Sequence, residues 1–290
     1  MKKYSKQYLG IEAPFTDYET ARFVVLPVPY EGGVSYGHGT DKAPDAIIEA
    51  SHYLELYDEV FDTEPYRMGI CTLAPMDTNI PPEQLIQNIQ NQVRALLDDE
   101  KCVAMLGGDH SISSGYARAI RDKYPEFSVI QLDAHSDLRD SYEGSIYSHA
   151  SVMARIRELT PHTLQLGIRS MSREEADYVQ KEKLLLCSMY RLRKQLFNLE
   201  AALSKLPDPV FITFDLDVMD WSIISSTGTP EPGGLLWDEA MEILALIFSK
   251  KKVIGFDLVE LSHSPYDNNS AFAAAKLLYK MMGFYQFNDH

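Results

Sequence analysis

The chain has 290 residues, with 27 Lys and Arg against 42 Asp and Glu, so its formal net charge at pH 7 is −15. This acidic balance argues against a nucleic-acid-binding protein, because such proteins present a basic face to phosphates. Apolar residues make up 45% of the chain, which excludes disorder throughout, and no apolar run reaches the ~20 residues of a membrane span. The cysteines Cys71, Cys102 and Cys187 are few and far apart, so we expect reduced thiols and a cytoplasmic protein. No linker divides the sequence, and we expect a single domain over residues 1–290.

Short continuous apolar runs recur along the chain, and a polar or glycine-rich turn follows each of them. Such runs are typical of strands buried on both faces of a parallel sheet. They cover residues 23–26, 103–106, 128–132, 163–166, 184–187, 210–214 and 253–256. Between them, apolar residues spaced three and four apart predict helices over 82–97, 113–124 and 236–249. This alternation predicts an α/β fold with a doubly wound, mostly parallel sheet.

Polar clusters follow three of the predicted strands, at the sheet edge where ligands gather in doubly wound folds. Successive side chains alternate faces in an extended segment, so Asp133, His135 and Asp137 can point the same way. The same holds for Asp215 and Asp217. Several ionisable groups on one side of a strand require compensating charge, and metal ions supply it.

Two divalent cations would balance the four carboxylates of this set. Because the set contains no cysteine, its oxygen and imidazole donors favour Mn, Mg, Co or Ni over a thiolate-type zinc site. A two-metal site of this kind makes a hydroxide at neutral pH and holds a substrate against it. Taken singly, each residue is as well explained as a cap or turn residue, and only the ordered set indicates metal binding. The candidate ligands are His110, Asp133, His135, Asp137, Asp215 and Asp217.

The motifs that carry these residues resemble those of the arginase/agmatinase (ureohydrolase) family. The resemblance implies a three-layer α/β/α fold, two Mn(II) ions per chain, with Co or Ni as alternatives, and hydrolysis of a guanidinium to urea and an amine. It also implies a homotrimer or homohexamer. The matching segments are residues 29–36, 39–47, 107–111, 133–139, 148–151, 214–218 and 255–260.

The resemblance also implies individual roles. Asp137 would orient the attacking hydroxide, His149 would be the proton shuttle, and Glu260 would pair with the substrate guanidinium. These roles are chemically reasonable, because a carboxylate can fix the plane of a guanidinium and a histidine can protonate a leaving amine near neutral pH. The implied metal ligands are His110 and Asp137 for one ion, His135 and Asp217 for the other, and Asp133 and Asp215 as bridges.

The segment 138–144 resembles agmatinases more than arginases. Agmatine ends in an ammonium, which the nearby Asp140 and Glu143 suit better than a carboxylate, and we expect Arg139 to face away from the pocket. The sequence therefore predicts an agmatinase that acts on a small cationic guanidino substrate and gives urea and putrescine, as in polyamine biosynthesis.

Other substrates stay open, because Asp220-Trp221 replaces the Asp-Pro that is usual in the family and can change the pocket wall. The alternatives are aminopropylagmatine, guanidinobutyrate, guanidine and arginine, or an inactive polyamine-binding relative. A two-metal phosphoesterase is disfavoured, since the strand-end motifs lack basic residues for phosphate.

Overall fold

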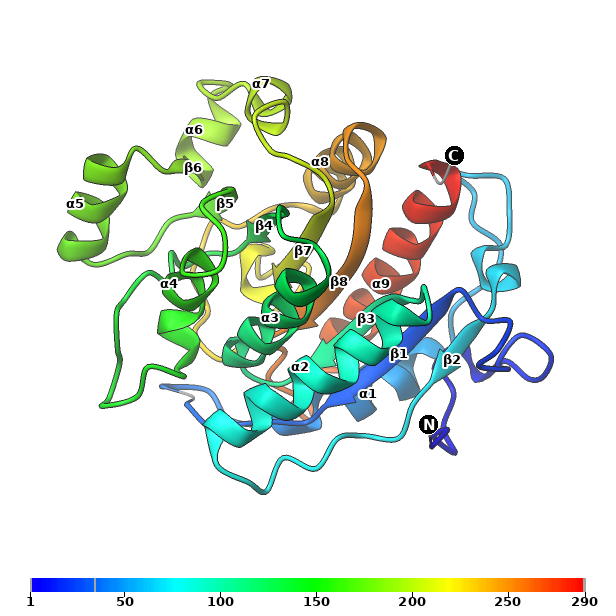
Figure 1. Ribbon diagram of the computed structural model, residues 1–290. Coiled ribbons are helices and arrows are strands. Elements are labelled where there is room, and N and C mark those ends of the chain that lie inside the picture. The colour runs from blue at the N-terminus through cyan, green and yellow to red at the C-terminus, as the bar shows by residue number, and fades with distance from the viewer. Residues whose placement is uncertain (1, 34, 289–290) are drawn as a thin grey trace.

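One parallel sheet forms the centre of the molecule (Figure 1). The computed structural model describes residues 2–33 and 35–288, and within them eight strands pair in the order β2-β1-β3-β8-β7-β4-β5-β6. Every pairing between these strands is parallel, which requires crossover connections that place helices on the faces of the sheet. The strands are β1 (Phe23–Val28), β2 (Ile70–Thr72), β3 (Cys102–Gly107), β4 (Ser128–Leu132), β5 (Thr163–Ile168), β6 (Leu185–Ser188), β7 (Val210–Asp215) and β8 (Val253–Val259).

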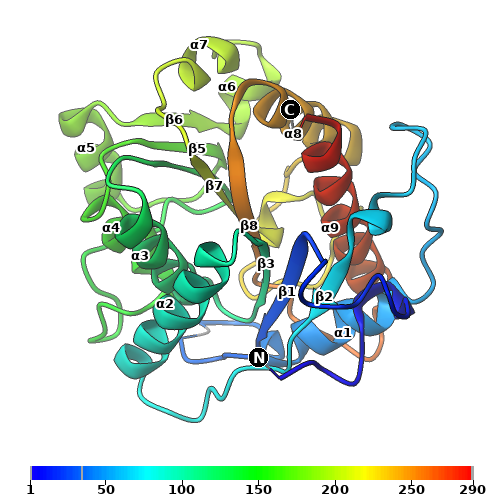
Figure 2. The same cartoon turned by 45° about the vertical axis from the view of Figure 1, so that its right-hand side comes forward.

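Helices cover both faces of the sheet, so the predicted three-layer α/β/α fold is confirmed (Figure 2). Helices α1, α8 and α9 share one apolar core with one face, and α2, α3 and α4 share a second core with the other. The helices are α1 (Ala43–Ser51), α2 (Pro82–Asp98), α3 (Ser113–Lys123), α4 (Val152–Arg157), α5 (Arg173–Glu182), α6 (Met189–Arg193), α7 (Leu199–Leu203), α8 (Trp237–Lys250) and α9 (Asn268–Asn288).

The burial of the strands explains their sequences. β1, β3, β4, β5 and β7 are buried along their whole length, as continuous apolar runs predict. The edge strand β6 is only partly buried.

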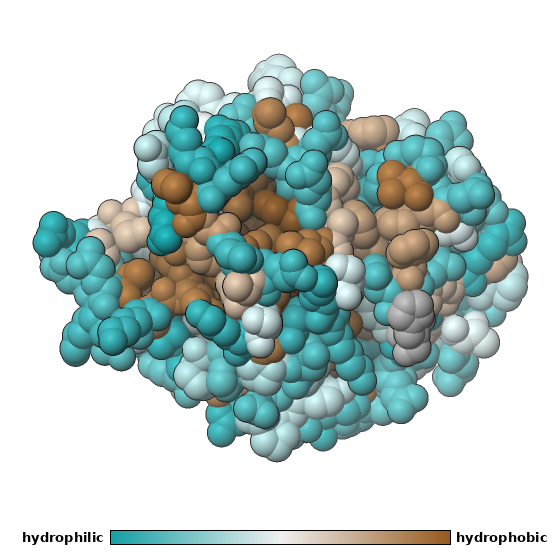
Figure 3. Space-filling view, turned by 90° about the horizontal axis from the view of Figure 1, so that it is seen from above, coloured by the Kyte–Doolittle hydropathy of each residue, from teal (hydrophilic) through white to brown (hydrophobic). Residues whose placement is uncertain are grey.

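On the side of the molecule where α5, α6 and α7 lie, apolar side chains gather in a hollow within a hydrophilic rim (Figure 3).

Helix α9 is apolar on most sides and carries a nearly continuous buried stretch from Leu277 to Tyr285. A helix with this pattern belongs in the core, and α9 packs against both α1 and α8. Despite its length, neither α9 nor any other helix of the described residues is apolar enough to cross a bilayer.

Basic residues line a cavity of about 660 Å³ at the amino ends of the strands. Helices α2, α3, α8 and α9 all end beside it, and the carboxyl ends of helices carry partial negative charge that cations stabilise. Lys123 accordingly donates to the carbonyl oxygen of Leu97, at the end of α2. The basic side chains of this cavity are Arg22, Lys101, Lys123, Lys250, Lys251 and Lys252, and Glu100 is the acidic one.

Candidate active site

The candidate site lies at the carboxyl ends of the four central strands. β3, β8, β7 and β4 are neighbours in the sheet, so the residues that follow them meet at one edge. His110 follows β3, Asp133 follows β4, Asp215 ends β7 and Glu260 follows β8. The fold therefore brings together motifs that lie as far apart as 150 residues in the sequence.

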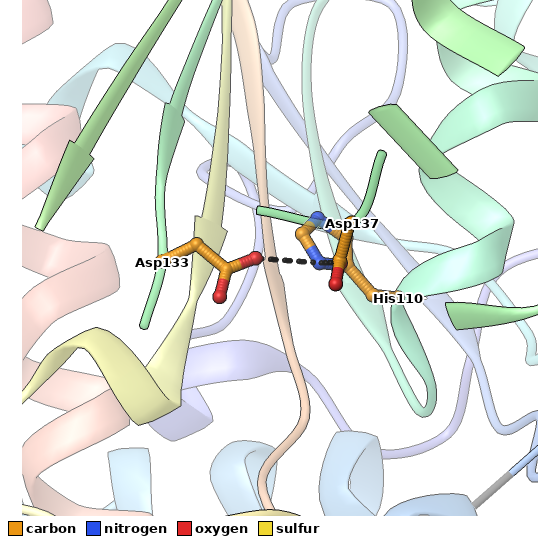
Figure 4. A group of neighbouring side chains, drawn as sticks. All are labelled: His110, Asp133 and Asp137. Carbon is orange, nitrogen blue, oxygen red and sulfur yellow. Dashed lines mark ion pairs between the residues drawn. The ribbon is translucent and has the colours of Figure 1, made fainter. Parts of the chain in front are cut away.

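His110 is the centre of the first group of candidate ligands. Its Nδ1 lies 3.2 Å from Oδ2 of Asp133, 3.2 Å from Oδ2 of Asp137 and 3.3 Å from Oδ2 of Asp215. Figure 4 shows the imidazole with Asp133 and Asp137 turned toward it. The His110 side chain is 1% exposed, and its Nε2 is bound to Thr213 Oγ1 at 2.8 Å, whereas the buried Nδ1 has no hydrogen-bond partner among the described residues. A buried imidazole nitrogen that has no hydrogen-bond partner and lies beside three carboxylates is suited to bind a metal ion.

His135 is the centre of the second group. Its Nδ1 lies 2.8 Å from Oδ2 of Asp217 and 3.7 Å from Oδ1 of Asp133. Asp133 belongs to both groups, since it offers one oxygen to each. Ligand atoms lie within 4.8 Å of one another in two sets, His110, Asp133 and Asp137, and Asp133, His135 and Asp217. This is the placement that a bridging carboxylate needs. Asp215 turns Oδ2 toward His110, and its Oδ1 accepts the backbone N–H of Asp217.

The charges of the cluster are unbalanced without an ion. Burial and the neighbouring Asp137 and Asp217 raise the pKa of Asp133 to about 8. Burial disfavours the charged form of His135, but its hydrogen bond to Asp217 outweighs that cost and raises the pKa of His135 to about 10. Burial, together with Asp217 and Asp133, also raises the pKa of Asp215 well above its usual value. Divalent cations would replace the missing positive charge, so the donor set fits two hard or borderline ions.

We expect the binding of Mn(II) near pH 7 to release protons, and its affinity to fall as the pH falls. At pH 7 both Asp133, with its pKa of about 8, and His135, with its pKa of about 10, hold protons in the metal-free protein. A ligand must lose its proton before it binds a metal. Titration calorimetry in buffers of different ionisation enthalpy counts the protons released. Binding that releases none, or that strengthens between pH 8 and pH 6, would contradict this expectation.

A buried polar chain, which the sequence did not single out, supports Asp133. The Nε2 of Gln131 donates to Oδ2 of Asp133 at 2.5 Å, and the Nε2 of Gln165 donates to Oε1 of Gln131 at 2.5 Å. Thr213 and Asp257 are likewise buried polar residues, in β7 and β8. Gln131, Gln165, Thr213 and Asp257 are polar residues within otherwise apolar strands. A polar residue inside an apolar run is the sequence signal by which these four could have been predicted.

Two site residues adopt a backbone conformation that is rare outside glycine. Asp137 has φ 52° and Glu260 has φ 66°. Such positions cost free energy and are retained where function or surrounding contacts require them. The backbone N–H of Glu260 donates to Gly108, and its Oε1 accepts the backbone N–H of His110 at 2.7 Å. Burial and the nearby Asp109 raise the pKa of Glu260 well above its usual value.

A pocket of about 280 Å³ opens beside the two groups, and it includes His149 together with the candidate ligands His135 and Asp137. Glu260 is not among its lining residues, since it lies against the backbone of His110. The other lining residues are Ser35, Ser136, Arg139, Tyr142, Ala150, Ser170, Met171, Ser172, Glu175 and Thr229.

Three expectations about the pocket, those for Arg139, Asp140 and Glu143, are wrong. Arg139 lines the pocket instead of facing away, because its guanidinium lies 5.1 Å above the ring of Tyr142 and its Nε lies 3.9 Å from Glu175. Asp140 does not line it: its side chain is 94% exposed and pairs with Arg155 at 2.9 Å. The carboxylate that lines the pocket, besides Asp137, is Glu175.

Glu143 is also absent from the pocket lining. It occupies the tip of a tight turn with Gly144, both with positive φ, and is exposed.

Fold and site together define the class: an α/β enzyme with two adjacent candidate metal groups at the carboxyl edge of a parallel sheet. The sequence profile of the Arginase family matches residues 21–283, and the chain belongs to this family. It is an agmatinase-like ureohydrolase, a hydrolase of guanidino compounds, in a family that depends on two metal ions and is typically oligomeric.

Named relatives cover nearly the whole chain. It is 39% identical to the N(1)-aminopropylagmatine ureohydrolase of Synechocystis sp., over 97% of this chain and 94% of that protein. It is 31% identical to the agmatinase of Pyrococcus horikoshii, over 98% and 99%. The crystal structure of the agmatine ureohydrolase of Thermoplasma volcanium superposes with a TM-score of 0.86 at 30% identity, over 99% of this chain and 95% of that one.

Proposed function

We propose that this enzyme hydrolyses the guanidinium of an agmatine-type substrate with a cationic tail, and that N(1)-aminopropylagmatine is the preferred one. The observation that carries the proposal is the pocket beside the two candidate metal groups. Its one arginine, Arg139, lies against Tyr142 and Glu175, and Glu175 adds a buried carboxylate. Such a pocket suits an amine better than a second carboxylate.

The relatives favour the longer tail. The proteins from Synechocystis sp. and Thermus thermophilus that are 39% and 35% identical to this chain are N(1)-aminopropylagmatine ureohydrolases. A third enzyme of that name, from Thermococcus kodakarensis, is 32% identical, as is the agmatinase of Halalkalibacterium halodurans. Agmatine, the first choice from the sequence, is therefore the second candidate. The products would be urea and a triamine from the longer substrate, or urea and putrescine from agmatine.

In the proposed mechanism, two bound Mn(II) ions would supply a hydroxide at neutral pH. Asp137 would orient the attacking oxygen, and Glu260 would hold the guanidinium through a charge-assisted hydrogen bond. His149 would give a proton to the amine nitrogen as the C–N bond breaks, so that oxygen leaves on urea and the proton leaves on the amine. The proposed ligands are His110 and Asp137 for one ion, His135 and Asp217 for the other, and Asp133 and Asp215 as bridges.

We also infer a single domain, a cytoplasmic location and a homotrimer or homohexamer. The single sheet, to which all strands of the described residues belong, supports one domain. Cys71 and Cys187 are free, buried thiols, which suits a reducing compartment. The partly exposed β6 edge supports association, and light scattering of the purified protein would give the number of chains.

A panel of substrates tests the proposal. With Mn(II)-loaded protein, we expect urea release with the highest kcat/KM for N(1)-aminopropylagmatine, a lower value for agmatine, and a value at least about 10²-fold lower for arginine. The repulsion between the α-carboxylate of arginine and the buried carboxylate of Glu175 is the cost that separates them. Guanidinobutyrate, guanidine and metal-free protein complete the panel.

An arginine value equal to that of agmatine would show that Arg139 turns from Glu175 to bind the carboxylate. Absence of urea from every guanidine would reject the activity itself.

A further inference from the structure

The side chains of Ser35 and Tyr142, from different parts of the chain, meet that of His149. Ser35 lies in the loop after β1, and Tyr142 lies in the loop after β4. The Oγ of Ser35 lies 3.1 Å from Nε2 of His149 and 3.4 Å from the hydroxyl of Tyr142. The rings of Tyr142 and His149 meet edge to face, with their centres 5.6 Å apart. All three residues line the pocket that contains Asp137.

The loop that carries Ser35 is anchored on both sides of this residue. The Asp109 carboxylate accepts the backbone N–H of Gly33 at 3.0 Å, and the Glu31 carboxylate accepts that of Gly39 at 2.6 Å. These two anchors flank Ser35 in the sequence. The hydroxyl therefore belongs to a loop that is held by two carboxylates.

A tight turn fixes Tyr142. Its backbone N–H and C=O exchange hydrogen bonds with Ser145, at 2.9 and 3.0 Å. The two residues between them, Glu143 and Gly144, have φ 49° and 80°. Positive φ at both central residues is the geometry of type I′ hairpin turns. The ring is further covered by the guanidinium of Arg139 at 5.1 Å.

We propose that Ser35 and Tyr142 are positioning residues for His149. The proposal rests on the proposed function, in which His149 protonates the leaving amine. When both ring nitrogens carry protons, the Nε2–H donates to the Ser35 hydroxyl, and that hydroxyl donates to Tyr142. The proton that passes to the leaving amine is then the one on Nδ1, which lies 3.4 Å from Ser148 Oγ. The chain of hydrogen bonds fixes the plane of the imidazole, so that its proton-donating geometry is set before the substrate arrives.

The competing role for these hydroxyls is to bind the tail of the substrate, because they line the same pocket. The two roles predict different kinetics. Loss of a tail contact raises KM with little change in kcat, whereas loss of a group that positions the proton donor lowers kcat. A group that acts through His149 also has no effect once the imidazole is removed.

The test measures urea release from the best substrate of the panel with S35A, S35T, Y142F and the matched control Y36F. Tyr36 is the neighbour of Ser35 and is 78% exposed, so Y36F removes a hydroxyl from the same loop without touching the imidazole. We expect S35A to lower kcat about 10-fold, in line with one net hydrogen bond, with KM within about 2-fold. S35T should keep the activity because it keeps the hydroxyl, Y142F should lower kcat less than S35A, and Y36F should match the wild type.

The decisive measurement is a double-mutant cycle. We expect S35A to change kcat by less than about 2-fold in the H149A background, because the residue through which Ser35 acts is absent. An equal loss in both backgrounds, or a rise in KM alone, would overturn the positioning role while leaving the hydrolase intact. Failure of the wild-type enzyme to release urea would instead count against the proposed function.

Discussion

Replacing Asp133 with alanine is expected to remove both metal ions and the hydrolase activity. Asp133 gives one oxygen to the group around His110 and the other to the group around His135. Outer partners of metal ligands alone are worth about 10–100-fold in affinity, so loss of a shared ligand should cost more than about 10²-fold. Elemental analysis after dialysis against micromolar Mn(II) would give the metal content, and an assay of urea release on the same preparation would give the activity.

Asp140→Asn is the matched control for this variant. It also removes one carboxylate from the same loop region, but its side chain is exposed and pairs with Arg155. We expect the control to keep two ions per chain. Retention of two ions by Asp133→Ala, with a circular dichroism spectrum like that of the wild type, would show that Asp133 does not bridge.

Replacing His149 with alanine should lower kcat by about 10²–10⁴-fold while the metal content stays at two ions per chain. A positioned general acid contributes a factor of this size. His149 lines the pocket, but it belongs to neither group of candidate ligands, so its loss should leave the ions in place. Steady-state urea release and elemental analysis on the same preparation separate the two effects.

His162→Ala is the corresponding control, because His162 lies just before β5, at the opposite edge of the sheet, near Glu126. It should retain wild-type kcat. Loss of metal from His149→Ala would show that His149 is a metal ligand. An unchanged kcat would show that His149 takes no part in the reaction.

The apolar strand runs and the two-residue spacing of Asp133, His135 and Asp137 were enough to predict the sheet and its functional edge. All seven predicted strands and three predicted helices are present. β2 was missed because three residues are too short for a pattern, and α9 because a helix that is apolar on most sides has no amphipathic stripe. The helices α1 and α5 were missed as well, and so were α4, α6 and α7, which have at most six residues and are too short for a helical repeat.

The pocket was harder to predict than the ligands. The candidate ligands belong to strand ends, where the sheet dictates direction, and the structure brings them together. Arg139 and Asp140 belong to a loop, and their directions depend on Tyr142, Glu175 and Arg155, whose positions no local pattern specifies. The roles of the ligands, of His149 and of Glu260 stay predictions, which the variants above address.

The basic cavity at the amino edge has a consequence for how a substrate arrives. Its lining carries a formal charge of +5, which leaves −20 on the rest of a chain whose total is −15. Three of these lysines are paired with carboxylates just outside the lining, Lys123 with Asp98, Lys250 with Glu200 and Lys251 with Asp208. The excess negative charge lies on the rest of the molecule, so a polyamine-like cation that diffuses toward the protein is drawn there, and its encounter with the protein is faster than by diffusion alone. Salt shortens the range of this field to about 8 Å at physiological ionic strength, and the rate of encounter, more than the chemical step, is what rising salt reduces.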